Sequence, residues 1–207
     1  MADQETVSER FSDEDATPAR KRPRPGERRL QILQTLASML EQPGVERVTT
    51  ASLAAKIGVS EAALYRHFAS KAQMFEGLID FVDQSVIGLI RQVTDREAAG
   101  PVQASRIVAL LLQFAEKNPG MSRVMIGDAL VLEHERLQER INLLFDKIEA
   151  QLRQSLKASD SPTPTADAQV AASLLVAFMQ GRLQRFARSG FKRLPSEHLQ
   201  AALTKML

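Results

Sequence analysis

Apolar residues recur three or four positions apart along most of the chain, which is the period of an amphipathic α-helix. The pattern predicts helices over residues 27–40, 51–57 and 60–67, and a longer one from residue 70 past residue 90. Further helices are expected around 107–112, 137–152 and 166–188, with a short one at the end of the chain. No strand pattern is present, so the predicted fold class is all-α. The first helix should bury Leu30, Leu33, Leu36, Ala37 and Leu40.

Residues 46–79 carry the signals of a helix-turn-helix. Thr49 and Thr50 offer hydroxyls where the first helix needs a cap, and Gly58 supplies the left-handed turn that ends it. Ser60 should cap the second helix, and Ser70 with Gln73 predicts a capping box that opens a third. An ordinary helical hairpin is the alternative. The ordered caps and the single turn glycine favour a DNA-binding head, with Phe68 filling its core.

Charge is distributed unevenly along the chain, although the formal net charge is only +2. Residues 1–19 hold six acidic residues against one arginine, whereas residues 20–71 hold ten Lys or Arg against four Glu. The basic excess coincides with the predicted head, as neutralisation of DNA phosphates requires. For the cluster at 20–29, an arm that touches DNA and a solvated tail are both open. Residues 1–25 are predicted to be disordered.

The predicted recognition segment, residues 60–68, contains neither Asn nor Gln, so direct reading of bases should be modest. Arg66 is its one candidate for a bidentate bond to guanine, and two alanines can meet thymine methyl groups. Hydroxyl, imidazole and ammonium groups around them should hold phosphates. The predicted DNA-binding residues are Thr49, Thr50, Ser60, Ala62, Ala63, Tyr65, Arg66, His67 and Lys71.

Composition excludes several classes of protein. The chain has no cysteine, and hence no disulfide framework and no thiolate metal site. No run of eighteen apolar residues appears and the N-terminus is acidic, which predicts a soluble cytosolic protein that neither spans nor binds a membrane. The three histidines lie far apart, and there is no glycine-rich phosphate loop or nucleophile elbow. We therefore expect no enzyme activity, no metal and no cofactor.

The last long helix has a long apolar face for a position near the C-terminus. Packing inside one subunit and a four-helix bundle shared by two subunits both explain such a face, and the shared bundle is favoured. The predicted dimer residues are Ala171, Leu175, Phe178, Met179, Arg182 and Phe186.

A DNA-reading head followed by a helical bundle is the layout of the TetR-type regulators, which this chain resembles from about Arg28 onward. Within them it resembles the nucleoid occlusion factors, on residues 47–51, 58–68, 116–120 and 133–154. The last two stretches lie outside the head, where TetR-type chains usually differ from one another. The resemblance implies a head at 26–72 and a dimerising, partner-binding bundle at 73–207.

This resemblance also implies a function. A homodimer would bind palindromic sites on the chromosome and antagonise polymers of the tubulin-like division protein FtsZ, with no small-molecule effector. Phe81, Leu110, Lys117 and Asn118 match positions of the family's FtsZ contact, whereas Leu89 and Gln113 stand where arginine and glycine are expected. From the residues alone, Phe81 and Leu110 are more readily core positions.

A ligand-responsive transcriptional repressor is the alternative from another functional class, and it needs a ligand pocket inside the bundle. The aromatic content of only 5% weighs against a roomy pocket.

Overall fold

The computed structural model describes residues 26–42, 47–157 and 164–207. These residues are helical or irregular and contain no strand, which confirms the all-α prediction. The proposed disorder of 1–25, the basic residues 20–25 and the loop at 160–163 lie outside the described residues. The elements are α1 Glu27–Leu40, α2 Thr50–Ile57, α3 Glu61–Tyr65, α4 Lys71–Thr94, α5 Pro101–Lys117, α6 Pro119–Met125, the 3₁₀ turn η1 Asp128–Leu130, α7 Glu135–Leu156, α8 Pro164–Arg188 and α9 Leu199–Met206.

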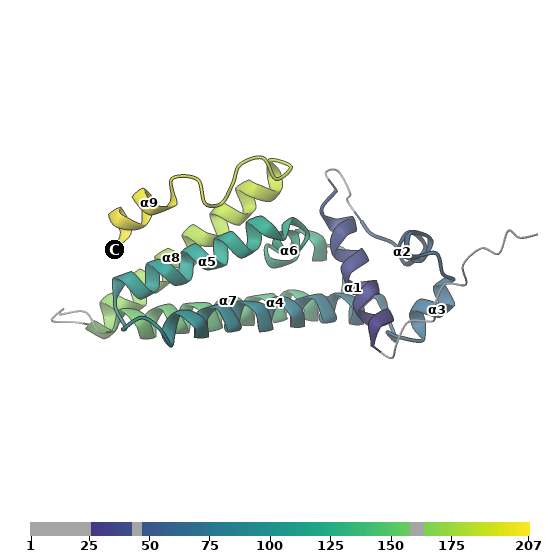
Figure 1. Ribbon diagram of the computed structural model, residues 1–207, viewed down its shortest axis with the longest axis horizontal. Helices are drawn as coiled ribbons and strands as arrows, with labels where there is room; N and C mark the ends of the chain where they lie inside the picture. Colours follow the sequence, from purple (N-terminus) through teal and green to yellow (C-terminus); the bar gives the residue numbers. More distant parts are fainter. Residues whose placement is uncertain (1–25, 43–46, 158–163) are drawn as a thin grey trace, which may run out of the picture.

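Helices α1 to α3 form a head at one end of an elongated molecule, and the C-terminus lies at the other end (Figure 1). Helix α4 leaves the head and runs along the bundle, and α5 returns beside it toward the head. Helices α7 and α8 complete the bundle and pack against each other. The short α6 contacts α1, α4, α5 and α8, so it lies where the head meets the bundle.

Helix α4 buries one continuous apolar stripe, as the sequence predicts. Phe75, Leu78, Ile79, Val82, Val86 and Ile90 are all buried. The start of α4 differs in one detail from the predicted capping box. Ser70 Oγ accepts a hydrogen bond from Gln73 N at 3.2 Å, but the Gln73 side chain accepts from Ala69 N rather than from Ser70.

The predicted inner face of α1 is only partly right. Leu36, Ala37 and Leu40 are buried, but Leu30 is 52% exposed and Ile32, two residues later, is fully buried. Because α1 packs against α2, α4 and α6 at once, the stripe that it buries is rotated from the one that spacing alone indicates.

Helix α6 was not expected from the sequence, which indicated only a break at residues 118–120. Pro119 occupies the first turn of α6, where its missing N–H has no helical partner to lose. The hydroxyl of Ser122, which is fully buried, donates to the carbonyl of Ala115 at 2.7 Å and closes the corner between α5 and α6. The close approach of α6 to α1 depends on Gly120, since an added Cβ would collide with the backbone oxygen of Ala37.

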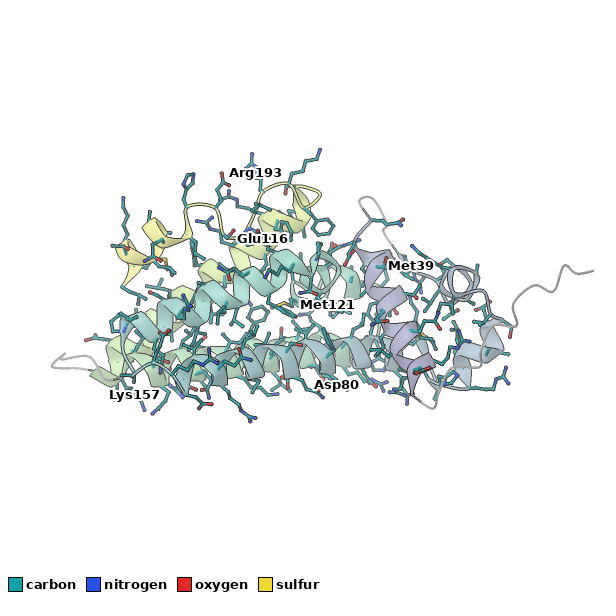
Figure 2. All side chains as sticks on the ribbon, viewed as in Figure 1. Met39, Asp80, Glu116, Met121, Lys157 and Arg193 are labelled. Atoms are coloured by element: carbon teal, nitrogen blue, oxygen red, sulfur yellow. The ribbon has the colours of Figure 1, made fainter. Side chains whose placement is uncertain are left out.

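Ion pairs join α4 to α7 along one side of the bundle. Glu76 pairs with Arg136, Asp80 with Arg140 and Asp83 with Lys147, and Figure 2 shows Asp80 on the outer side of the bundle. On the opposite side, Glu116 of α5 accepts a hydrogen bond from Ser196 Oγ at 2.5 Å. This bond fastens the segment that carries Arg193 and leads to α9 (Figure 2).

Replacing Gly120 with alanine should lower the free energy of unfolding by about 1–3 kcal/mol, since backbone has to move to admit the methyl group. Gly88→Ala in α4 is the matched control, because nothing lies within 4 Å of its added Cβ. Alanine there should raise stability by up to about 1 kcal/mol. Urea unfolding at one fixed protein concentration measures both. Equal stability of the two variants would contradict the close approach of α6 to α1.

Candidate nucleic-acid interface

Local hydrogen bonds build the helix-turn-helix as the sequence predicts. Thr49 Oγ1 accepts from Ser52 N, and Ser52 Oγ accepts from Thr49 N, each at 3.1 Å, which is a reciprocal capping box for α2. Gly58 ends α2 in the left-handed conformation, with φ of 76°. Ser60 Oγ then accepts from Ala63 N at 3.3 Å and caps α3. The chain therefore turns from α2 into α3 within a very short segment.

The head has its own small core, and this core decides which residues face outward. Leu53, Ala54, Ile57, Leu64 and Phe68 are buried, the last as predicted. The opposite side of α3 and the residues after it are open to solvent. Ser60, Ala62, Tyr65, Arg66 and His67 are exposed there, and Ala63 is half-buried. Helix α3 ends at Tyr65, earlier than the predicted residue 67.

Arg29 is exposed, but its side chain contacts the end of the recognition segment. Its Nη1 donates to the backbone oxygen of His67 at 2.8 Å, and its guanidinium lies 4.0 Å from the centre of the Phe68 ring. This geometry combines a hydrogen bond with a cation–π contact. One member of the basic cluster at 20–29 thus has a structural role in the head.

An acidic residue lies on this otherwise basic surface, and sequence reasoning overlooked it. Glu61, the first residue of α3, is exposed, and its Oε2 accepts a hydrogen bond from Thr50 Oγ1 at 2.6 Å. The Thr50 hydroxyl, expected to bond DNA, therefore has a protein acceptor in this structure. The residue types alone gave one signal for this site, namely a carboxylate inside a predicted recognition segment.

Lys71 is turned toward the bundle, where it forms an ion pair with Glu133. The side chains of Lys71 and Glu133 are only 18% and 8% exposed. Arg47, just before α2, approaches the same carboxylate at 3.9 Å. Two cations of the head thus face one anion of the segment between η1 and α7. Contact of Lys71 with phosphate, which the sequence suggested, requires the ammonium to leave Glu133.

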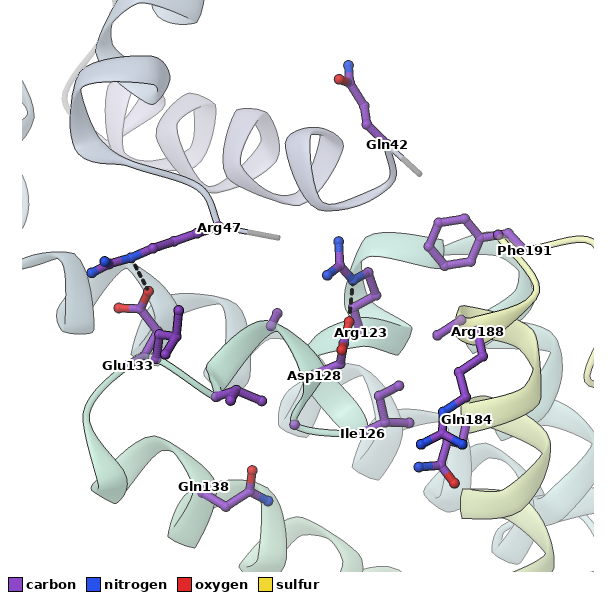
Figure 3. A pocket seen from close by; sticks show the side chains of 16 residues that line it. Gln42, Arg47, Arg123, Ile126, Asp128, Glu133, Gln138, Gln184, Arg188 and Phe191 are labelled. Atoms are coloured by element: carbon purple, nitrogen blue, oxygen red, sulfur yellow. Dashed lines mark hydrogen bonds and ion pairs between the residues drawn. The ribbon is translucent and has the colours of Figure 1, made fainter. Parts of the chain in front are cut away.

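An open pocket of about 910 Å³ lies at this junction of head and bundle (Figure 3). Its walls come from the ends of α1 and α8 and from the segment between α6 and α7. Charged and amide side chains line much of it, and an ion pair of Arg123 with Asp128 at 2.6 Å crosses one wall. The lining also includes Gln42, Arg47, Glu133, Gln138, Gln184 and Arg188.

The residues suggested for partner contact lie on α4 and α5. Phe81 is 46% exposed, which corrects the expectation that it is a core residue. It stands about 120° around the helix from the buried stripe, at 100° per residue. Leu110 is half-buried against the core, Lys117 is exposed, and Asn118 donates from its side chain to Phe114 O at 2.7 Å.

The two helices that carry these positions run antiparallel and pack against each other (Figure 1). Phe81 lies in the half of α4 that is nearer the head, and Lys117 is the last residue of α5, which ends near the head. Both exposed side chains therefore belong to the part of the bundle that is closer to the head.

The predicted dimer residues need correction. Leu175, Met179 and Phe186 are buried within the protomer's own core, so they present no surface to a partner. Ala171, Phe178 and Arg182 are half-buried, and the Arg182 guanidinium lies 4.8 Å from the centre of the Phe178 ring. The exposed apolar residues of α8 are on its opposite face, where Val170 is 61% exposed and Leu174 is 58% exposed.

Several solved structures of similar fold are transcriptional regulators, and some of them are named as TetR-like or TetR-family proteins. A TetR-like transcriptional regulator from Rhodococcus sp. RHA1 superposes with a TM-score of 0.70 at 18% identity, over 89% of this chain and 97% of that one. The transcriptional regulator FadR from Bacillus subtilis, in complex with stearoyl-CoA, gives a TM-score of 0.65 at 13% identity, over 86% of this chain and 96% of that one. The architecture is therefore that of a TetR-type regulator.

Sequence comparison narrows the class. Residues 32–78 match the model of bacterial regulatory proteins of the tetR family, and residues 100–206 match a SlmA-like model described as the tetracyclin repressor-like C-terminal domain. Nucleoid occlusion factor SlmA of Idiomarina loihiensis is 49% identical over 177 residues, 84% of this chain and 90% of that protein. SlmA of Shewanella oneidensis is 50% identical, over 83% and 88% of the two chains.

The chain belongs to the SlmA family of nucleoid occlusion factors. Members of this family and of the wider TetR family are DNA-binding regulators rather than enzymes, in agreement with the expectation from the sequence. Within the described part of the chain, no helix is long and apolar enough to cross a lipid bilayer.

Replacing Glu133 with glutamine should lower the free energy of unfolding by about 2 kcal/mol, because the largely covered Lys71 ammonium loses its counter-charge. Asp80→Asn, which breaks the exposed pair with Arg140, is the matched control and should cost less than about 1 kcal/mol. Thermal unfolding of the two variants beside the parent protein measures the difference. If both lost the same stability, the junction of head and bundle would not depend on Glu133.

Proposed function

We propose that this protein is a DNA-bound division inhibitor, which binds palindromic chromosomal sites as a homodimer and antagonises FtsZ polymers over the nucleoid. The observation that carries the proposal is the presence of two separate outward surfaces on one chain. The head presents Tyr65, Arg66 and His67, and the bundle presents Phe81 on α4 and Lys117 on α5. One surface suits DNA, and the other remains open to a protein partner.

For the DNA surface, the exposed side chains suit contacts to the sugar-phosphate backbone. Tyr65 and His67 offer donors without a rigid pattern for bases, and Arg66 can pair with guanine. Ala62 and Ala63 leave room for close approach to the groove floor. We assign the head to residues 26–72 and the bundle to residues 73–207, with α4 shared across the boundary.

The outer face of α8 supports the proposed dimerisation. Val170, Leu174, Ala177 and Gly181 are all exposed and recur at spacings of four, three and four residues, on the side opposite the buried face. A helix that is apolar on two opposite faces buries the second one against another molecule. Leu143 of α7 is also exposed, and it lies near the middle of its helix, as Ala177 does in the antiparallel α8.

A symmetric pair of α7–α8 hairpins makes a four-helix bundle. The two heads would then sit on one side of the dimer, and palindromic half-sites about one DNA turn apart match such a pair.

For the partner surface, an exposed aromatic ring and an exposed cation are residue types typical of interface anchors. Phe81 supplies the ring, Lys117 the charge, and Leu110 further apolar area. A segment of FtsZ with apolar and acidic side chains would complement this face.

No observation favours a ligand-responsive repressor. Such a protein needs an enclosed cavity, whereas the pocket of about 910 Å³ is open at the head–bundle junction, and its lining mixes charged and amide side chains with apolar ones. The stearoyl-CoA complex of FadR belongs to that protein, and 13% identity carries only the fold.

Replacing Leu174 with aspartate should convert the dimer to monomers at micromolar concentration. Twofold symmetry places the unpaired charge in the interface twice, so the dimer dissociation constant should rise at least about 100-fold. Val102→Asp is the control, because Val102 is also an exposed apolar residue (76%) but belongs to the start of α5 and not to the outer face of α8. Sedimentation equilibrium distinguishes the two states. A Leu174→Asp protein that stayed dimeric would remove the outer face of α8 from the interface.

Replacing Lys117 with aspartate tests the proposed function directly. DNA affinity should stay within about twofold of the parent, because the residue lies on the bundle and a surface substitution costs little stability. The effect on FtsZ should fall at least about tenfold, since the reversed charge meets the same partner at the interface rim. Polymer recovered by sedimentation, with specific DNA present, gives the readout.

Lys205→Asp is the matched control, because Lys205 is also an exposed cation in the last turn of a helix. It should leave both activities unchanged. If the parent protein left FtsZ polymers intact and instead released its DNA on meeting a small molecule, the repressor function would replace the one proposed here.

A further inference from the structure

The acidic side chain on the DNA-facing surface has no role in the function proposed so far. Glu61 is the first residue of α3, and it is exposed, as are Arg66 and His67 just after the end of the same helix. A negative charge at this place repels DNA phosphates and weakens binding to every sequence. A favourable contact elsewhere in the complex has to offset that repulsion.

The geometry around Glu61 favours a contact to a base edge. Thr50 Oγ1, on α2, donates to Oε2 at 2.6 Å and so fixes the direction of the side chain. Within the described residues, Thr50 is the one hydrogen-bond donor to this carboxylate. Oε1 therefore remains able to accept a bond from outside the protein. In a helix-turn-helix, the first residues of the second helix contact base edges in the major groove.

Base chemistry then selects the partner. A carboxylate only accepts hydrogen bonds, and in the major groove cytosine presents the N4 amino donor without an adjacent acceptor. Guanine offers acceptors alone and would be rejected at the same position. We propose that Glu61 reads a cytosine in each half-site and that Thr50 is its positioning residue. This inference rests on the proposed DNA binding and adds a determinant of specificity to it.

The competing explanation is a local role in the helix. An acid in the first turn favours a helix through its dipole, whether or not DNA is bound. Glu135 is likewise the first residue of its helix, α7, which belongs to the bundle. Glu135→Gln therefore removes an acid from the first turn of a helix that does not contact DNA. The two glutamates therefore separate base reading from helix stabilisation.

The test uses the full-length dimer and a library of random double-stranded DNA, from which bound sequences are selected and read. The parent protein should enrich cytosine at one position in each half-site, and its replacement there should weaken binding about tenfold. Glu61→Gln should enrich adenine at that position instead, because an amide pairs with adenine N6 and N7. It should also bind random DNA more tightly, since each subunit loses one negative charge.

Variants of Thr50 test its positioning role. Thr50→Val, which lacks the hydroxyl, should lower discrimination at the cytosine position without a switch to adenine, whereas Thr50→Ser should restore the parent preference. Glu135→Gln should leave every base preference unchanged. A Glu61→Gln protein with the parent's base preferences at all positions would overturn the inference. A parent protein that enriches no palindrome would instead contradict the proposed DNA binding, which is a different result in the same experiment.

Discussion

The structure depends on one constraint, which is that α4 supplies core residues to the head and to the bundle at the same time. Met74 and Phe75 are buried near the head, and Val82, Val86 and Ile90 are buried farther along the same helix. Its 24 residues extend about 36 Å. The head therefore cannot rotate against the bundle without either bending this helix or exposing apolar side chains at one of its ends.

Contacts at the junction strengthen the same constraint. Gly120 lets α6 approach the backbone of α1 closely, and Glu133 faces Lys71 and Arg47 of the head. By contrast, the ion pairs between α4 and α7 are mostly exposed and contribute little each. Steric fit and partly buried charge thus set the direction of the recognition helix, while the outer ion pairs mainly align two helices that already pack through apolar faces.

Local features were predicted correctly because neighbouring residues decide them. Thr49 and Ser60 cap their helices and Gly58 takes the left-handed turn, all within a few residues of their partners. It was harder to predict which face of a helix is buried within the protomer. Helix α8 is apolar on two sides, so spacing alone did not show that Leu175 and Met179 serve the protomer while Leu174 faces outward.

Contacts between distant segments were also missed, for a different physical reason. Lys71 and Glu133 are 62 residues apart, and no periodicity along the sequence relates them. The role of Glu61 depends on Thr50 in the preceding helix, which becomes visible only once Gly58 has folded the two together.

Because one continuous helix, α4, joins the head to the part of the bundle that carries Phe81, the positions of the two proposed surfaces are coupled. Lys71 begins the helix beside the DNA-binding head, and Phe81 follows ten residues later, about 15 Å along the axis. In a dimer seated on two half-sites, the spacing of the recognition helices fixes the angle of both α4 helices. That angle in turn fixes where the two Phe81 rings stand relative to the DNA axis. The spacing of the two recognition helices on DNA and the position of the two Phe81 rings are therefore coupled in this fold. A change in that spacing changes the angle of each α4 helix, and the Phe81 rings move with it.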